Sequence, residues 1–196
     1  MQENHATQIV KSMTRASDNQ VADIMAISRV MEIKKGHHFV SAGDIPRNFA
    51  FVMRGLFRYF YMDEKGNEFT KGFFQENSVI SSYSALIENR ESFFTIEALE
   101  NSLVLIVDYL EWKDLLKNDP TWHQFLIRML EKGYCTKEAR EREFLLFDAE
   151  ARYKSFLKRY PGLDSRIKQH LIASYIGITP VALSRIRKKM GIVNMG

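Results

Sequence analysis

The sequence predicts an α+β protein in which an antiparallel β-roll or sandwich is followed by a long helix and a small helical domain. Three observations support this fold class. From Met31 to about Val107, apolar residues mostly alternate with polar ones between recurring glycine turns, as in short antiparallel strands. From Tyr109 to Phe147, apolar residues instead recur every three or four positions, as on one side of a helix. Residues 148–196 then form a short, strongly basic segment with helical patterning.

Length and composition indicate a globular protein. The 196 residues can form one large domain or two small ones, and 45% hydrophobic with 27% charged residues excludes disordered and fibrous classes. No apolar run is long enough to span a membrane, and MQENHATQIVK lacks the basic-then-apolar order of a signal peptide, so we expect a cytoplasmic protein. The lone Cys135 excludes an internal disulfide and an iron-sulfur cluster.

The N-terminal part is expected to consist of short helices and then strands. Scattered apolar positions in residues 4–28 predict one or two helices. Turns at Gly36, Gly43, Gly55 and Gly66 separate the following strands, and the last turn joins LFRYFYM to EFTKGFF in a hairpin. Regular turn spacing of this kind is typical of an antiparallel roll or sandwich.

A long helix is expected to begin at Pro120. Proline is tolerated at the first helical position behind an aspartate cap, here Asp119, and the pattern continues to Phe147. About 27 residues at 1.5 Å each make about 40 Å, more than a small domain covers. The four-and-three spacing therefore predicts a homodimer helix, with packing against the protein's own roll as the alternative. The predicted dimer interface consists of Trp122, Leu126, Met129, Gly133 and Phe147.

The C-terminal quarter begins with a new helix and carries the positive charge. Asp148 starts an apolar-faced helix that ends at Pro161-Gly162. Residues 148–196 contain 10 Lys and Arg against 3 Asp and Glu, a net charge of +7, whereas residues 1–147 contain 18 against 21, a net charge of −3. A local excess of this kind favours polyanion binding, and an ordinary basic surface is the alternative. The predicted domains are 1–119, 120–147 and 148–196.

The segment QHLIASYIGITPVALSRIRKK, residues 169–189, has the spacing of a helix-turn-helix. Gly177 supplies the sharp turn, and Thr179 followed by Pro180 is a helix cap with proline at the first position. Small Ala173 is expected where the two helices cross. The candidate DNA-binding residues are Thr179, Pro180 and the outward-facing or basic residues of the second helix, which are Val181, Ser184, Arg185, Arg187, Lys188 and Lys189.

The order of these elements, with IASYIGITPVALSRIRKK near the C-terminus, resembles the Crp/Fnr family of bacterial transcription regulators over nearly the whole chain. The resemblance implies a cyclic-nucleotide-binding-like β-roll (a double-stranded β-helix), a dimerising long helix and a winged-helix DNA reader. By the same resemblance, Thr179, Pro180, Val181 and Arg185 occupy DNA-facing positions, with Arg185 matching an arginine set against guanine. The implied partners are a second copy, a palindromic double-stranded operator and, for an activator, RNA polymerase.

The sequence departs from the family where a cyclic phosphate would be held. Ser81-Ser82 stand in place of a Gly-Glu pair, and Ser92-Phe93 stand in place of an Arg-Ser pair. Without a buried arginine, an anionic phosphate would be desolvated uncompensated, so cyclic AMP is not expected to bind. A more neutral, aromatic pocket for an unidentified small molecule is one expectation, and its filling by Phe93 and Phe94 is the other. The candidate pocket residues are Ser81, Ser82, Tyr83, Ser84, Arg90, Phe93 and Phe94.

Two further departures concern the reader domain. After Met190-Gly191 only IVNMG follows, so we expect a short or absent wing. Lys168 stands where a capping Ser or Thr is common, so the first motif helix is expected to take its cap from Asp164 or Ser165.

Catalytic and metal sites are not expected. His37 and His38 are adjacent in a strand, so their side chains point to opposite faces and cannot share one metal. No nucleophile-base pair, paired carboxylates or phosphate-binding glycine loop stands out, and no cofactor is identified. The leading hypothesis is a dimeric DNA-binding regulator. The alternative is a sensor or scaffold protein that keeps the fold without DNA binding or ligand response.

Overall fold

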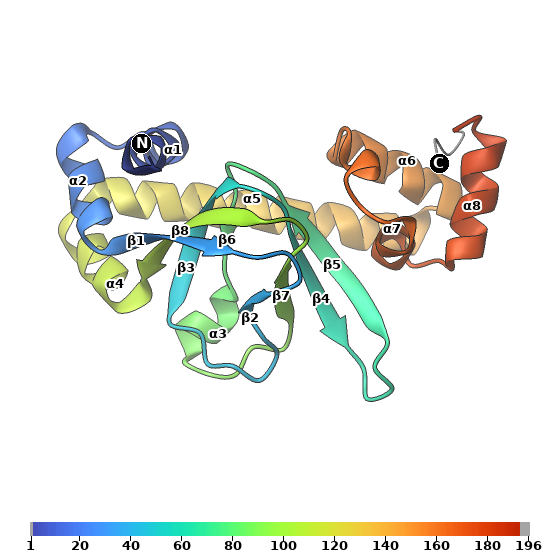
Figure 1. Cartoon of the computed structure of the whole chain (residues 1–196), viewed down its shortest axis with the longest axis horizontal. Coiled ribbons are helices and arrows are strands. Elements are labelled where there is room, and N and C mark those ends of the chain that lie inside the picture. Colours follow the sequence, from blue (N-terminus) through green and yellow to red (C-terminus); the bar gives the residue numbers. More distant parts are fainter. Residues whose placement is uncertain (1, 193–196) are drawn as a thin grey trace. The chain divides into compact units, whose positions relative to one another are not determined.

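The computed structural model describes residues 2–192 and divides them into two compact units (Figure 1). The first unit contains residues 2–61 and 72–131, and the second contains residues 62–71 and 132–192. The units therefore divide the long helix α5 (Pro120–Leu146), whereas the borders expected from the sequence lie at its two ends. The tail beyond residue 192, where a wing would have to lie, is outside the described residues.

Within residues 2–192, eight strands form two antiparallel sheets, with strand orders β1-β8-β3-β6 and β2-β7-β4-β5. The strands are β1 (Ser28–Ile33), β2 (His38–Val40), β3 (Asn48–Arg54), β4 (Phe57–Met62), β5 (Glu68–Phe74), β6 (Val79–Ile80), β7 (Thr95–Ala98) and β8 (Ser102–Asp108). The central strand β8 pairs with β1 and β3, so that Ser28 lies opposite Val107 and Ala50 opposite Ile106. The predicted antiparallel β-roll and the α+β fold class are confirmed.

The sheet that contains β3 has two apolar faces, because successive strand residues point to opposite sides. On β3, Ala50 and Val52 belong to the core between the sheets, whereas Phe49 and Phe51 belong to a second core under the helices. That second core is covered by α1 (Gln2–Thr14), α2 (Asp18–Ala26), α4 (Tyr109–Asn118) and the start of α5. Figure 1 shows these helices gathered around β1, β3 and β8.

The start of α5 is fixed as the sequence predicts. Asp119 accepts a hydrogen bond from the Thr121 amide at 2.8 Å, and Pro120 is the first helical residue. The side chain of Gln20 on α2 donates to Asp119 and to the Thr121 hydroxyl, at 2.5 and 2.9 Å. Where one or two helices were expected in residues 4–28, the structure has α1 and α2, and α2 contacts the start of α5 directly.

The second unit contains the end of α5 followed by three helices and one turn of 3₁₀ helix. These elements are α6 (Ala149–Arg159), η1 (Leu163–Ser165), α7 (Gln169–Ile176) and α8 (Pro180–Lys189). Asp148 caps α6 by accepting from the Ala151 amide at 2.8 Å. Tyr153 and Phe156 of α6 are fully buried with Leu163 and Ile172, so a small core holds the helices together. Within the described residues, no helix is long and apolar enough to cross a membrane.

Candidate nucleic-acid interface and effector pocket

The turn between α7 and α8 has the geometry that its sequence predicts. Gly177 adopts a φ of 71° and its amide donates to the carbonyls of Ala173 and Ser174, which ends α7. A β-carbon at position 177 would lie 2.7 Å from the Phe144 ring, so glycine is required by both backbone and space. The Thr179 hydroxyl accepts from the Ala182 amide at 3.2 Å, and Pro180 follows as the first residue of α8.

The two helices bury one face and expose another. Ala173, Leu183 and Ile176 are almost completely buried, and the burial of Ala173 agrees with its expected place where the helices cross. Val181 is 62% exposed although it is apolar. With it, one continuous exposed face of α8 and its cap is formed by Thr179, Pro180, Val181, Ser184, Arg185 and Lys188. A face with a hydroxyl, an apolar group and two cations at helical spacing suits the edges and phosphates of a nucleic-acid groove.

Arg187 does not belong to this face, and its assignment to DNA contact was wrong. Its side chain is buried: Nη1 donates to the Tyr153 hydroxyl at 2.6 Å and lies 3.8 Å from the carboxylate of Asp164. Position 187 is four residues after buried Leu183 and therefore lies on the same inward side of α8. That spacing was available in the sequence, but the basic cluster around it obscured the signal.

Lys189 is exposed but already has a partner. Its ammonium group lies 2.6 Å from Glu150, which also pairs with Lys154 at 2.8 Å. Hydrogen bonds from Lys154 and Lys189 lower the pKa of Glu150 to about 2. Lys188 therefore presents its charge outward, whereas the charge of Lys189 is shared with a carboxylate.

The cap of α7 differs from the expectation. Lys168 occupies the cap position, and its side chain makes no capping hydrogen bond. Asp164 and Ser165 lie in η1, where the Ser165 hydroxyl donates to the carbonyl of Gly162 at 2.7 Å. The 3₁₀ turn therefore takes up the residues that were expected to cap the next helix.

The segment expected to line an effector pocket is mostly engaged with itself. Ser82 is buried with its hydroxyl 2.8 Å from that of Ser92, and Ser92 in turn donates to the carbonyl of Phe94. The Ser81 amide donates to the Tyr59 hydroxyl at 2.7 Å. Tyr83 and Ser84 begin α3 (Tyr83–Glu88), where Tyr83 is half-buried and Ser84 is exposed.

Stacked aromatic rings fill the interior of the roll beside these serines. Tyr59 lies between Phe74 and Phe94, with ring centroids 4.1 and 5.1 Å away. All three belong to, or pack against, the core between the two sheets. Burial raises the pKa of Tyr59, so its hydroxyl stays neutral. Of the two phenylalanines considered as pocket fillers, Phe94 therefore fills the interior.

Phe93 and Arg90 lie on the outside of the roll. Phe93 is 69% exposed, and the guanidinium of Arg90 lies 4.2 Å from its ring centroid. Arg90 is also paired with Glu88. The structure does not bring these two residues, or exposed Ser84, to the interior where Ser82 and Phe94 lie. No cation of the candidate set therefore reaches the place where a cyclic phosphate would be held.

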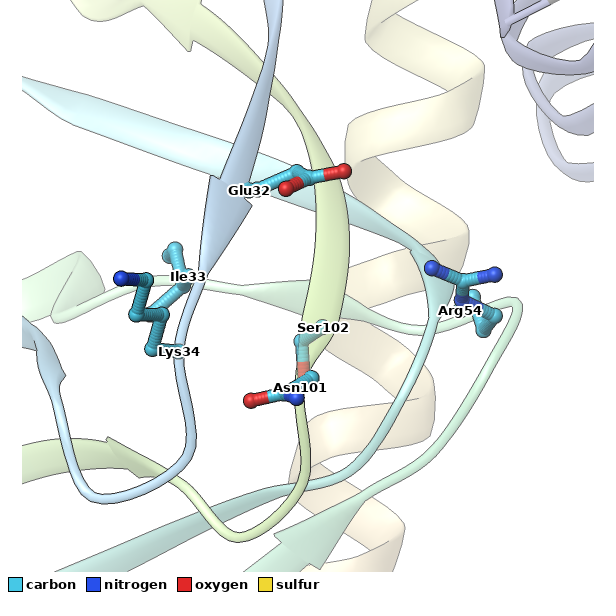
Figure 2. A pocket seen from close by; sticks show the side chains of 6 residues that line it. All are labelled: Glu32, Ile33, Lys34, Arg54, Asn101 and Ser102. Carbon is cyan, nitrogen blue, oxygen red and sulfur yellow. The ribbon is translucent and has the colours of Figure 1, made fainter.

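Two surface hollows occur elsewhere on the first unit. One has a volume of about 250 Å³ and is shown in Figure 2, with the charged side chains of Glu32, Lys34 and Arg54 at its rim. The hydroxyl of Ser102, which lines this hollow, donates to the carbonyl of Glu100 at 2.8 Å. The other, of about 370 Å³, is lined by residues 39–40 and 44–48. Neither contains a residue of segment 81–94. In the described part of the chain, no three His, Cys, Asp or Glu residues are grouped for a metal ion.

The residues expected at a dimer interface are not the exposed apolar residues of α5. Trp122 is fully buried in the core under the helices, its ring centroid 5.2 Å from that of Trp112, so it is unavailable to a partner. Leu126 and Met129 are half-buried, and Met129 packs against the same core. Gly133 and Phe147 are exposed.

The exposed apolar stripe of α5 is rotated from the predicted one. It consists of Ile127, Leu130 and Tyr134, which are 53%, 45% and 68% exposed. Their spacing of three and four residues places them on one side of the helix. The sequence contained both stripes, and the structure assigns the one with Trp122 to the protein's own core.

The roll is similar in sequence to a known type of domain. Residues 30–119 match the family model of the cyclic nucleotide-binding domain. The roll is thus similar to cyclic nucleotide-binding domains, and the helices α7 and α8 with their turn follow it in this chain. A search of the curated proteins gave no significant match.

Solved structures extend the likeness beyond the roll. FixK2 from Bradyrhizobium japonicum matches at a TM-score of 0.74 with 16% identity, over 87% of this chain and 89% of that one. The c-di-GMP responsive regulator CLP of Xanthomonas campestris matches at 0.73 with 14% identity, over 89% and 92%. A putative Crp/Fnr regulator from Eubacterium rectale matches at 0.72 with 16% identity, over 93% and 88%. The chain has the fold of Crp/Fnr transcription regulators, as the sequence resemblance predicted.

Proposed function

We propose that this protein is a dimeric, sequence-specific DNA-binding transcription regulator whose roll does not hold a cyclic nucleotide. The observation that carries the proposal is the exposed face of α8, with Arg185 and Lys188 directed away from the core of the second unit. Solved structures with a similar fold also support the proposal. Action on chromosomal DNA would place the protein in the cytoplasm, and RNA polymerase is a partner only if the protein activates transcription.

The exposed residues of α8 suit different parts of DNA because their side chains differ in chemistry. Arg185 can donate two parallel hydrogen bonds to O6 and N7 of guanine, whereas Lys188 near the helix end suits a phosphate. Val181 offers no acceptor to cytosine, so it favours an apolar contact such as the thymine methyl. The α8 N-terminus with Thr179 adds backbone amides that suit a phosphate.

A second copy is the partner proposed for α5. The exposed stripe of Ile127, Leu130 and Tyr134 has coiled-coil spacing and would be covered in a parallel pair of helices. Leu130→Glu should shift the protein toward monomer in sedimentation, because it places carboxylates in an apolar seam. Lys132→Glu, at an exposed neighbouring position, is the control. A dimer unaffected by Leu130→Glu would move the interface elsewhere.

The roll interior supports the absence of a cyclic nucleotide. Phe74, Tyr59 and Phe94 are stacked in the core, and Arg90 lies outside against Phe93 and Glu88. A cyclic phosphate would have to displace aromatic packing and give up its hydration without a cation in return. The same filling favours a ligand-independent form of the alternative hypothesis, a scaffold with this fold.

Selection of bound DNA from a random double-stranded library tests the proposal. The wild-type protein should select a palindrome with half-site centres about 34 to 36 Å apart. Arg185→Ala should lose about 1 to 3 kcal/mol of binding free energy and relax one base per half-site, and Lys188→Ala should weaken all sequences alike. Arg142→Ala, which removes an exposed arginine from α5, is the matched control. Failure of the wild type to enrich any double-stranded sequence would leave the scaffold hypothesis in its place.

A further inference from the structure

A charged network inside the second unit joins the end of the long helix to the helix-turn-helix. Glu143 on α5 accepts two hydrogen bonds from Arg159 on α6, at 2.6 and 3.1 Å. The side chains are only 12% and 21% exposed. Nη1 of Arg159 also donates to the hydroxyl of Tyr175 on α7 at 2.8 Å. One guanidinium on α6 therefore contacts two other helices, α5 and α7.

Arg140 makes a second connection, one turn earlier on α5. Its Nη2 donates to the carbonyl of Tyr175 at 3.2 Å, and its guanidinium lies 3.8 Å from the Tyr175 ring centroid. Nη1 donates to the carbonyl of Lys71 at 2.8 Å. Tyr175 is thus held at its backbone, its ring and its hydroxyl by two arginines.

Strand residues 68–71 hold α7 from a further side. The hydroxyl of Ser174 accepts from the Thr70 amide at 2.8 Å and donates to the carbonyl of Glu68 at 3.0 Å. Phe144 of α5 touches the turn at Gly177, where a β-carbon would not fit. The first motif helix and its turn are therefore contacted at Ser174, Tyr175 and Gly177.

These contacts span the short non-helical connection between α5 and α6. Helix α5 ends at Leu146 and α6 begins at Ala149, so the covalent connection between them is two residues long. Ion pairs and hydrogen bonds are directional, and arginine-carboxylate pairs with two bonds fix orientation as well as distance. The network therefore joins α6 and α7 to the end of α5, and α8 follows α7 directly after the turn at Gly177.

We propose that Glu143, Arg159, Arg140 and Tyr175 are positioning residues that set the spacing between the two half-sites that a dimer recognises. The inference rests on the proposed function, in which α5 pairs with its copy and α8 contacts DNA. A shift of about 3.4 Å at one recognition helix equals the rise of one base pair, so a small change in direction changes the preferred spacer. None of the four residues is assigned a contact with DNA.

The test compares spacer preference with half-site affinity. Binding is measured to a set of duplexes whose two half-sites are separated by spacers that differ by single base pairs, and to a duplex with one half-site. Wild type should prefer one spacer sharply. Tyr175→Phe removes the hydroxyl alone, and Glu143→Gln removes the charge while keeping the shape. Each should lower the ratio of best to next-best spacer about fivefold, with one-half-site affinity unchanged.

Controls separate positioning from folding and from the proposed function. Glu141→Gln and Arg142→Met alter exposed charges on the same helix and should leave the spacer profile unchanged. Thermal unfolding shows whether each variant is folded, and Tyr175→Phe remains informative if Glu143→Gln unfolds. A sharp wild-type profile that both variants retain overturns the inference alone. A wild type that binds one spacer no better than another also overturns it. A wild type that binds no duplex overturns the proposed function and the inference together.

Discussion

The exposed face of α8 and the interior of the roll differ in whether they present cationic side chains. On α8, Arg185 and Lys188 remain in solvent, where a polyanion can replace water and counterions at little cost. In the roll, the space between the sheets contains stacked rings, and the nearest candidate cation, Arg90, lies outside. One region is suited to receive phosphates and the other to exclude them. A fold similar to cyclic nucleotide-binding domains therefore does not by itself place a cation where a cyclic phosphate would be held.

The largest effect is expected from opening the roll interior. Phe94→Ala should lower the free energy of unfolding by about 3 to 5 kcal/mol, because it removes a buried ring from the stack with Tyr59. The exposed neighbour Phe93 provides the control, and Phe93→Ala should cost less than about 1 kcal/mol. Urea unfolding of both variants measures the contrast. Equal losses would contradict the assignment of Phe94 to the interior and Phe93 to the surface.

A somewhat smaller effect is expected from the two arginines of α8. Arg187→Ala should lower the free energy of unfolding by about 2 to 4 kcal/mol, since it leaves the Tyr153 hydroxyl and Asp164 without their buried partner. Arg185→Ala should change stability by less than about 0.5 kcal/mol. Denaturant titration of the two variants gives the comparison. The division of α8 into an inward and an outward side fails if Arg185→Ala is the more destabilising change.

Lys71 supplies an intermediate case, because it is a half-buried cation. Burial, together with the charges of Lys137 and Arg140, lowers the pKa of Lys71 to about 8. Because the unfolded chain binds this proton more tightly, the folded protein gains stability as the pH rises from about 8 toward the ordinary lysine pKa. Lys71→Met should therefore stabilise the protein by about 1 kcal/mol at pH 7, with the gain fading across that range. Melting curves of both proteins from pH 7 to 10 would refute this if the difference stayed constant or grew.

The smallest effect is expected from cyclic AMP itself. A nucleotide bound to the native state alone would stabilise it by about 2.7 kcal/mol at a hundredfold excess over Kd. With the interior occupied by stacked rings and Arg90 on the outside, we expect no measurable change in Tm at millimolar cyclic AMP. Phe94→Ala measured in the same way sharpens the comparison, since it vacates space without adding a charge. A clear rise in the wild-type Tm would mean that the stacked rings move aside for a ligand.

Local patterns in the sequence were sufficient for the elements and for most of the exposed face of α8. Asp119-Pro120, Asp148 and Thr179-Pro180 begin helices where expected, because caps act within one turn. Gly177 ends α7 for the same local reason.

Residues whose position depends on distant partners could not be placed in this way. Arg187 is buried because Tyr153 and Asp164 reach it, and Trp122 is taken by a core that includes Trp112. The filling of the roll depends on Tyr59 of β4 and Phe74 of β5, which lie outside the segment 81–94 where a cyclic phosphate would be held. In each case a short-range pattern allowed two outcomes, and tertiary packing selected one.

The stacked rings in the roll also bear on how such a regulator would be controlled in a cell. With the interior occupied by Phe74, Tyr59 and Phe94, a small molecule would not bind there, and the regulator would not respond to its concentration. The fraction of operator occupied would then follow the number of protein molecules present. Where monomers predominate, dimer concentration rises with the square of total concentration, so synthesis and proteolysis would set a steeper response than either does for a monomeric binder.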